Sequence, residues 1–308
     1  MYLNNVYKKR SKAGRAENVS GLLMAIIPVI GFVLFGLIPL VLAFVMAFLE
    51  IPGRGGRIEE AIFAKLENFE AVLSDHMFWK SIGNTLIMAL SLPICIVIAL
   101  VIAYLLTKKI KGVKVFRSIY FIPYVCCAVA VALMWELIFN QSHGILNAFL
   151  GLSRDEAIGW LTDSKYYLPV LIVIGIWSGT AYGIVLYGAA LTNVNSSLYE
   201  AAKVDGANSF QSFLHITLPA ISPTTFYLLV TGLIGALQEF TRPQVIGGEG
   251  GAGPNSDGLT IVFYVYRNAF SYDGTMGIAA AAALILAILI LIVTVINFAV
   301  SKKWVSYD

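Results

Sequence analysis

Six long apolar stretches, separated by more polar segments, dominate the pattern of hydrophobic and polar positions along the chain. No Asp, Glu, Lys or Arg interrupts Gly21–Leu49, Ile82–Leu106, Ser118–Trp135, Tyr167–Leu191, Pro219–Leu237 or Thr275–Val300. A helix needs about 20 apolar residues to cross the hydrocarbon core of a bilayer. We therefore expect an all-α integral membrane protein with six transmembrane helices, at about residues 21–49, 82–106, 118–138, 167–191, 219–241 and 273–300. A tail of residues 1–20 would precede a membrane domain of residues 21–308.

Lysine and arginine gather on one side of the predicted membrane. If the spans alternate in direction, 13 of the 21 basic residues fall on one side, together with only four of the 18 acidic residues. These 13 basic residues lie in the tail, in the loop of residues 108–117, at Lys203 and at the C-terminal end. Short cytoplasmic loops carry an excess of Lys and Arg. Both termini, and the loop of residues 195–219, are therefore predicted to be cytoplasmic.

Composition agrees with a membrane protein and gives no support for catalysis. The chain is 58% hydrophobic and 13% charged, with a mean hydropathy of +0.80, whereas a soluble domain carries roughly 25% charge. The cysteines (Cys95, Cys126 and Cys127) lie in apolar stretches without CxxC spacing, and the three histidines are far apart, so we expect no metal site. No carboxylate pair or Ser/His/Asp order has a recognisable spacing.

The chain shows no nucleotide-binding motif of its own. The P-loop pattern GxxxxGK[ST] does not occur. The run Gly248–Gly253 formally matches GxGxxG, but Pro254 follows it and no strand–helix context surrounds it, so we expect a flexible extracytoplasmic loop. The basic loop of residues 108–117 adjoins a span, and we interpret it as a topology signal in contact with lipid and not as a nucleic-acid site.

The cytoplasmic segment of residues 195–219 is too elaborate for a simple connector, which usually needs about 2–8 residues. Ser197 and Glu200 have the S-x-x-E spacing of a capping box, which predicts a short helix that begins near Leu198. Gly206 suits its C-terminal end. A second amphipathic piece is expected over residues 208–217, after which Pro219 would open the next span.

This segment resembles the EAA loop of the permease subunits of bacterial ABC importers. The resemblance is carried by Glu200-Ala201-Ala202-x-x-Asp205-Gly206-Ala207 and by Leu218-Pro219 further on. It implies the type I ABC importer (MetI-like) permease fold. It also implies that coupling to the ATPase falls to Glu200, Ala201, Ala202, Asp205, Gly206, Ala207, Leu218 and Pro219. In that family this loop is a helix that sits in a cleft of the ATP-binding subunit.

Looser matches elsewhere are similar to the carbohydrate group of these permeases, the maltose, glycerol-3-phosphate and oligosaccharide importers, and to the member of the permease pair usually encoded first. They include Ile27-Pro28, Asn84-Thr85 and the run from Gly247 to Ala280, with Tyr264, Tyr266-Arg267 and Ala269-Phe270. Glu249–Gly253 interrupt the Gly-Gly-Pro typical of the group, so no particular sugar is indicated.

The resemblance implies a transport subunit, without enzyme activity, in the bacterial inner membrane. Its expected partners are a second homologous permease, an ATPase dimer, an extracytoplasmic solute-binding protein, a carbohydrate and membrane lipid, with no nucleic acid. ATP and Mg²⁺ would be bound by the ATPase subunits, and the chain itself would hold no cofactor.

Polar residues inside spans are candidates for a substrate pathway, because lipid disfavours them. The candidates are Trp177, Ser178 and Tyr182 in the fourth span, and Thr231, Gln238 and Glu239 in the fifth. Two alternatives stay open. Gly175, Gly179 and Gly183 form a small-xxx-small stripe, so this face could serve helix packing, and Glu239 could pair with Arg242. Asn84 and Thr85 are expected to make helix contacts.

Two other classes of protein fit six spans with buried polar residues: an ion-coupled secondary transporter, and a membrane scaffold or sensor without transport activity. The EAA-like segment separates these classes from an importer permease, because neither of them needs a cytoplasmic docking helix.

Overall fold

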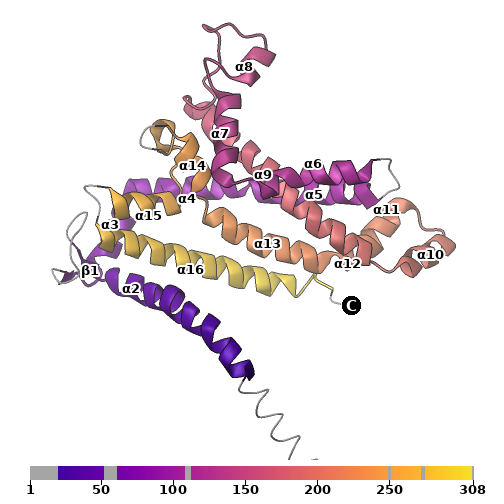
Figure 1. The fold of residues 1–308 in the computed structure, drawn as a ribbon, viewed down its shortest axis with the longest axis horizontal. Helices are drawn as coiled ribbons and strands as arrows, with labels where there is room; N and C mark the ends of the chain where they lie inside the picture. The colour runs from indigo at the N-terminus through magenta and orange to yellow at the C-terminus, as the bar shows by residue number, and fades with distance from the viewer. Residues whose placement is uncertain (1–19, 52–60, 108–111, 249–250, 272–274, 307–308) are drawn as a thin grey trace, which may run out of the picture.

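The computed structural model describes residues 20–51, 61–107, 112–248, 251–271 and 275–306 (Figure 1). Within them the regular secondary structure is helical, apart from the short antiparallel strands β1 and β2. The elements are a helix over Ser20–Met46 that contains η1 (Val33–Leu37) and α2 (Ile38–Met46), then β1 (Leu49–Glu50), β2 (Ile62–Phe63), α3 (Glu67–Ser74), α4 (His76–Ala89), α5 (Ser91–Thr107), α6 (Val113–Val125), α7 (Ala128–Phe139), α8 (Ile145–Phe149), α9 (Ser164–Asn193), α10 (Ser196–Val204), α11 (Ser209–Ser212), η3 (Phe213–Thr217), α12 (Leu218–Ala220), α13 (Ser222–Leu237), α14 (Thr241–Ile246), η4 (Pro254–Ser256), α15 (Ile261–Phe270) and α16 (Met276–Ser301).

Four helices of the described chain are long and apolar enough to cross a membrane: Ser20–Met46, His76–Thr107, Ser164–Asn193 and Met276–Ser301. Each lies within a few residues of a predicted span, except that the second begins six residues earlier than expected, at His76. Two further helix pairs would bring the number to six, if each bent pair counts as one span.

The third predicted span, at residues 118–138, is wrong as a single straight helix. Helix α6 ends at Val125 and α7 begins at Ala128, and the two helices are bent by 107°. Cys126 and Cys127 have extended ψ angles of 141° and 132°, which end the helical path. Pro123, inside α6, has no N–H to donate to the preceding turn. Figure 1 shows α7 rising from the bundle beside α14, with α8 beyond it.

The sequence predicted that the fifth span begins at Pro219, and this prediction is wrong. One helix runs from Ser209 to Ala220 and is bent by 60° from the helix that starts at Ser222. A π-helical turn precedes the proline, and in it the Leu218 N–H donates to the Phe213 carbonyl. The wider turn accommodates the missing N–H of Pro219, because π-bulges occur where the regular bonding of an α-helix is interrupted.

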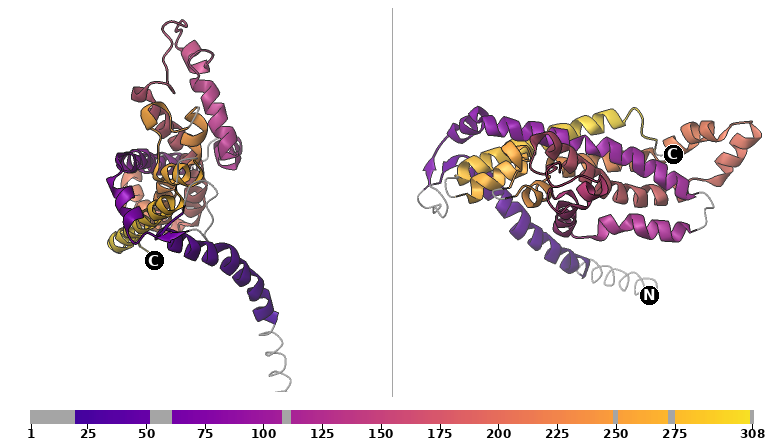
Figure 2. Two further views of the ribbon diagram at one scale, coloured as in Figure 1. Left: turned by 90° about the vertical axis from the view of Figure 1, so that its left-hand side faces the viewer. Right: turned by 90° about the horizontal axis from the view of Figure 1, so that it is seen from above.

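The helices form an elongated bundle in which α9 packs along α5 and α6, while α13 packs against α16 (Figures 1 and 2). The segment with α10 and α11 lies at one end, opposite α3, β1 and α15 (Figure 1). Only the C-terminal part of the first helix, α2, packs against α16, and the rest diverges from the bundle (Figure 2).

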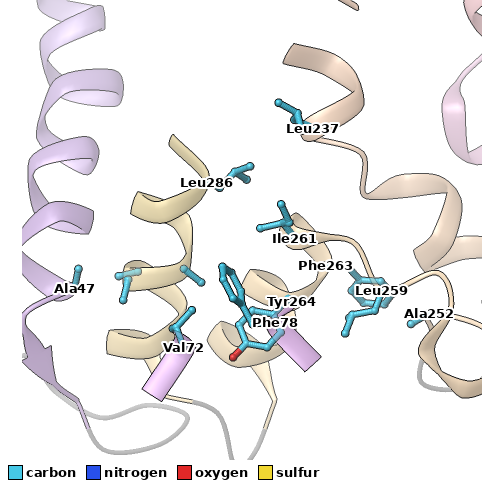
Figure 3. Packing of buried hydrophobic residues seen from close by; sticks show 13 residues of the cluster. Ala47, Val72, Phe78, Leu237, Ala252, Leu259, Ile261, Phe263, Tyr264 and Leu286 are labelled. Atoms are coloured by element: carbon cyan, nitrogen blue, oxygen red, sulfur yellow. The ribbon is translucent and has the colours of Figure 1, made fainter. Parts of the chain in front are cut away.

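A hydrophobic cluster ties the end near α3 together (Figure 3). Phe78 of α4 and Tyr264 of α15 meet edge to face at 5.5 Å between ring centroids. The Tyr264 hydroxyl donates to the Asp75 carboxylate at 2.7 Å. Burial, and then this carboxylate, raise the pKa of the Tyr264 phenol above its ordinary value. A tyrosine phenol is already protonated at neutral pH, so Tyr264 can donate this hydrogen bond there.

Candidate functional site

A cavity of about 580 Å³ lies among α5, α6, α7, α9 and α13, the residues that connect α13 to α14, and the start of α14. Five of the six residues predicted for the substrate pathway line it: Ser178, Tyr182, Thr231, Gln238 and Glu239. The sixth, Trp177, is half-buried outside the lining and packs edge-on against Trp135 at 5.5 Å. Two groups of residues, separated in sequence by at least 49 positions, therefore meet around one hollow.

Two hydroxyl groups of the cavity donate to their own helices. Ser178 donates to the Ile174 carbonyl at 2.9 Å, and Thr231 donates to the Tyr227 carbonyl at 2.7 Å. Each oxygen keeps lone pairs that can accept a hydrogen bond. The Gln238 amide is exposed and has no hydrogen-bond partner within the described chain, so it can both donate and accept.

Three tyrosines from different helices meet beside the cavity. Tyr182 of α9 stacks on Tyr124 of α6, with 5.1 Å between centroids and 19° between the ring planes. The hydroxyl of Tyr182 lies 3.2 Å from that of Tyr227 on α13. Tyr124 also lines the cavity and was missed by the sequence analysis. The criterion that selected Tyr182, an aromatic hydroxyl inside an apolar stretch, applies to Tyr124 as well.

An ion pair between Glu239 and Arg242 forms one part of the cavity wall. The sequence left open whether Glu239 belongs to a substrate pathway or pairs with Arg242, and in the structure it pairs with Arg242 and also lines the cavity. The guanidinium also donates to the Leu171 carbonyl at 3.2 Å. It fits against α9 because residue 175 is glycine, where a Cβ would lie 2.2 Å from Arg242 Nη1.

The glycine stripe of α9 serves close packing against α5, as the alternative interpretation predicted. A Cβ added at Gly179 would lie 2.9 Å from Cys95 Sγ, and one at Gly183 would lie 2.6 Å from Ala99 Cβ. Such distances leave no room for a larger side chain. Gly175, Gly179 and Gly183 line the cavity together with Ser178 and Tyr182, so this part of α9 both packs against α5 and borders the cavity.

Asn84 and Thr85 hold the segment before α15 and do not line the cavity. Asn84 donates to the carbonyls of Ser256 and Leu259 at 3.0 and 3.1 Å. The Thr85 hydroxyl accepts from the Ile261 N–H at 3.1 Å. The expectation that these polar residues make helix contacts is confirmed.

The glycine-rich loop was predicted to be flexible, and its described part is instead pinned to the bundle. Residues 249 and 250 lie outside the described residues. Lys80 forms an ion pair with Asp257 at 2.9 Å, and Asn255 donates to Ser164 at 2.8 Å. Gly253 (φ +66°) lies so close to the Tyr167 ring that a Cβ would be 2.3 Å from its Cζ.

The segment of residues 195–219 contains the short helix that the sequence predicted, with a different N-cap. The helix begins at Ser196, and the Asn195 side chain accepts from the Ser197 N–H at 3.0 Å. The predicted capping box of Ser197 and Glu200 is therefore wrong. Asn195 has an extended ψ of 121° that suits a cap, whereas Ser197 already lies in the first helical turn.

Gly206 ends α10, as predicted. Its φ is +81°, and the Ala207 N–H donates to the Ala202 carbonyl at 2.9 Å, while the Gly206 N–H donates to that of Lys203 at 3.2 Å. This is the pattern of a Schellman motif, in which glycine adopts the left-handed conformation without steric cost. The chain then turns back into α11, where Asn208 and Gln211 form a capping box.

A hydrogen bond of 2.8 Å between the hydroxyls of Tyr199 and Thr217 ties α10 to the helix that leads into α13. Thr217 is buried, whereas Val204 and Phe210 are 88% and 68% exposed. Of the residues predicted for coupling, Ala202, Ala207 and Leu218 are half-buried, and the exposed ones are Glu200, Ala201, Asp205, Gly206 and Pro219. The segment is thus a protrusion with apolar and acidic side chains on its surface.

No three His, Cys, Asp or Glu side chains of the described chain converge as they would around a metal ion. The cavity contains most of the residues predicted for the substrate pathway, and the protrusion contains those predicted for coupling.

Long apolar helices around a cavity that contains polar groups, with a helical protrusion at one end, are typical of a membrane transport subunit. A family model described as "Binding-protein-dependent transport system inner membrane component" matches residues 87–306. The chain belongs to this family. It is a permease subunit of the bacterial inner membrane, and in ABC transporters of this kind a separate subunit carries the ATPase.

Two relatives match nearly the whole chain. "Probable ABC transporter permease protein YesP" of Bacillus subtilis (strain 168) is 32% identical, covering 97% of this chain and 96% of that protein. "Lactose transport system permease protein LacF" of Rhizobium radiobacter is 31% identical, covering 96% and 98%.

Solved structures agree with these relatives. A bacterial ABC transporter involved in the import of the acidic polysaccharide alginate matches with a TM-score of 0.76 and 26% identity, over 92% of this chain and 95% of that chain. A bacterial alginate ABC transporter in complex with an alginate pentasaccharide-bound periplasmic protein also matches with a TM-score of 0.76, at 25% identity, over 91% and 93%. The fold is therefore the MetI-like permease fold.

Proposed function

We propose that this chain is the translocating permease of an ABC importer for a sugar or oligosaccharide that an extracytoplasmic binding protein delivers. The observation that carries the proposal is the cavity of about 580 Å³, where aromatic rings and hydrogen-bonding groups from four helices meet. Sugars present apolar ring faces and a rim of hydroxyls, so stacking on Tyr124 or Tyr182 and hydrogen bonds to Gln238 and Thr231 suit them. Relatives named for lactose and alginate support this class of substrate.

The membrane topology belongs to the same proposal. Counting each bent helix pair as one span gives six spans, so both termini lie on the same side. The bias of Lys and Arg assigns that side to the cytoplasm. The segment of residues 195–219 then also lies in the cytoplasm, and the cavity opens between the two sides.

In the proposed complex, energy enters through the protrusion of residues 195–219. We assign the ATPase contact to Glu200, Ala201, Ala202, Asp205, Gly206, Ala207, Leu218 and Pro219. Exposed apolar side chains such as Val204 and Phe210 suit burial in a cleft of a partner. Tyr199 and Thr217 would carry a displacement of α10 into α13, which lines the cavity. ATP and Mg²⁺ are bound by the partner ATPase subunits and not by this chain.

The complete importer would contain this chain, a second homologous permease, two ATPase subunits and the binding protein. The cavity is a hollow on one chain, and the second permease would close it from the other side. The structural neighbour in complex with a sugar-bound periplasmic protein supports delivery from outside.

Uptake by the reconstituted complex tests the proposal. Proteoliposomes should accumulate a labelled saccharide only when binding protein is outside and ATP is inside. Ionophores that dissipate ion gradients should leave uptake unchanged. Uptake without ATP that disappears with the ion gradient would indicate an ion-coupled carrier and would reject the proposal.

A further inference from the structure

The cavity carries one carboxylate and one guanidinium. Among the residues that line it, Glu239 is the one acid and Arg242 the one base, and no Lys or His joins them from the described chain. Both side chains are mostly buried, at 16% and 18% exposure. The cavity wall that this chain provides therefore has no net charge.

The two charges neutralise each other in a fixed geometry. Glu239 Oε2 pairs with Arg242 Nη2, and the other carboxylate oxygen accepts from the Arg242 backbone N–H at 3.1 Å. Thr260 donates to the Glu239 carbonyl at 2.6 Å, which anchors the backbone of the pair. On its other side the guanidinium donates to the Leu171 carbonyl and fits into the space that Gly175 leaves by having no side chain.

This geometry disfavours an anionic substrate. A sugar carboxylate in the cavity would have to leave water and find a cation, and the one cation on this wall already has a carboxylate partner. An unpaired buried charge is costly, and so is breaking one partner of a buried pair away from the other. A neutral sugar meets no such cost, because its hydroxyls can use the tyrosine, threonine and amide groups.

We propose that the cavity selects uncharged saccharides, and that Glu239 sets this selection by occupying Arg242. The inference rests on the proposed sugar transport and adds the charge class of the sugar. Glu239 is thus a specificity-determining residue. Without its charge, the guanidinium keeps its position against Leu171 and gains free N–H donors that match a carboxylate in a bidentate manner.

The variant Glu239→Gln tests this directly. Gln keeps an oxygen that can accept from the Arg242 N–H, so the local backbone retains its bond. The purified complex, in detergent and without binding protein, is titrated with pairs of probes: di- and trisaccharides of glucose, galactose and mannose, and the corresponding uronates. Saturation-transfer NMR measures binding of each. Asp155→Asn removes a carboxylate from the exposed loop outside the cavity and is the matched control.

The wild type and Asp155→Asn should bind at least one neutral probe and should prefer it to its uronate. Glu239→Gln should shift the ratio of affinities toward the uronate by about tenfold, the size expected for one new hydrogen-bonded ion contact. The double variant Glu239→Gln/Arg242→Gln should return to the wild-type preference. A wild type that binds uronate and neutral probe equally, or a Glu239→Gln protein with an unchanged ratio, overturns the inference and leaves sugar transport standing. If no saccharide of either kind binds, the proposed function fails and the inference fails with it.

A thiol measurement tests the neutral wall without altering the ion pair. Cys126 is exposed and lines the cavity, so it serves as reporter after Cys95→Ser and Cys127→Ser. Anionic and cationic methanethiosulfonates should react with it in the same ratio as with a free cysteine peptide, within about threefold. A much faster anionic reagent would mean that Arg242 is not neutralised, and the inference would be wrong.

Discussion

At the scale of single residues, the stacked rings of Tyr124 and Tyr182 are the strongest candidates for direct contact with the substrate. Tyr182→Ala removes both the stacking on Tyr124 and the hydroxyl contact with Tyr227, and Tyr182→Phe removes only the hydroxyl. An aromatic contact contributes about 1 kcal/mol, so we expect Tyr182→Ala to raise the KM for saccharide uptake about fivefold, with a smaller rise for Tyr182→Phe.

Initial rates of ATP-driven uptake at increasing saccharide concentration measure the KM. Trp177→Phe is the control, since Trp177 lies outside the cavity lining, and its KM should stay within about twofold of the wild type. Equal effects of Tyr182→Ala and Trp177→Phe would contradict the assignment of the cavity.

Gly253 is expected to affect the stability of the fold, because a side chain at this position would not fit. A Cβ there would lie 2.3 Å from the Tyr167 ring at a φ of +66°, whereas Gly248 has a similar φ of +71° with no atom within 4 Å. Both alanine variants strain the backbone, and only Gly253→Ala also forces the loop away from Tyr167. We expect Gly253→Ala to lower the free energy of unfolding by about 1–3 kcal/mol more than Gly248→Ala does. Thermal unfolding of the purified complex compares them, and equal melting temperatures would refute the packing argument.

Most polar cavity residues could be predicted one by one, because a polar side chain in an apolar stretch needs a reason. Their grouping could not. Thr231 and Gln238 join Ser178 only because α13 packs beside α9, and nothing local in the sequence encodes that contact. The same criterion selected Trp177, which does not line the cavity, because an indole also packs well against another aromatic ring, here Trp135.

At the scale of elements, hydropathy predicts where a span lies along the chain and not where it bends. The stretch around Pro123 is as apolar as its neighbours, yet the chain turns by 107° between α6 and α7. Such a bend depends on the extended conformations of Cys126 and Cys127, which cysteine does not favour by itself. At Pro219 the sequence predicted the start of a span, but the helix continues through the proline after a π turn, and the break lies at Ile221.

The left-handed end of α10 is the element-scale feature to test. Gly206 (φ +81°) and Gly151 (φ +70°) both have open space around them and differ only in where they lie. Valine at either position strains the turn by about 1–3 kcal/mol. We expect Gly206→Val to displace α10 and to reduce saccharide-stimulated ATPase activity by at least about tenfold, while Gly151→Val keeps most of it.

Both variants should assemble with the partner subunits, and co-purification through a tag on this chain checks this. If Gly206→Val and Gly151→Val hydrolyse ATP at the same stimulated rate, the end of α10 has no part in coupling.

At the scale of the whole molecule, the cavity and the protrusion lie on one continuous set of helices. Helix α9 lines the cavity and leads directly into α10, and Tyr199 contacts the helix that leads into α13. A movement of the protrusion can therefore reach both walls of the cavity. The overall class of protein was predictable because span length, basic loops and the EAA-like segment are all local in sequence.

Photo-cross-linking from Val204 tests the central claim most directly, namely that the segment of residues 195–219 receives the energy of a partner ATPase. Val204 is 88% exposed on α10, and Phe149, at the far end of α8, is 85% exposed. A benzophenone amino acid replaces each residue in the assembled importer within native membranes. Val204 should cross-link to the ATPase subunit, more strongly when ATP closes its dimer, and Phe149 should not. An ATPase adduct from Phe149, or its absence from Val204 in a transport-active complex, would contradict the account.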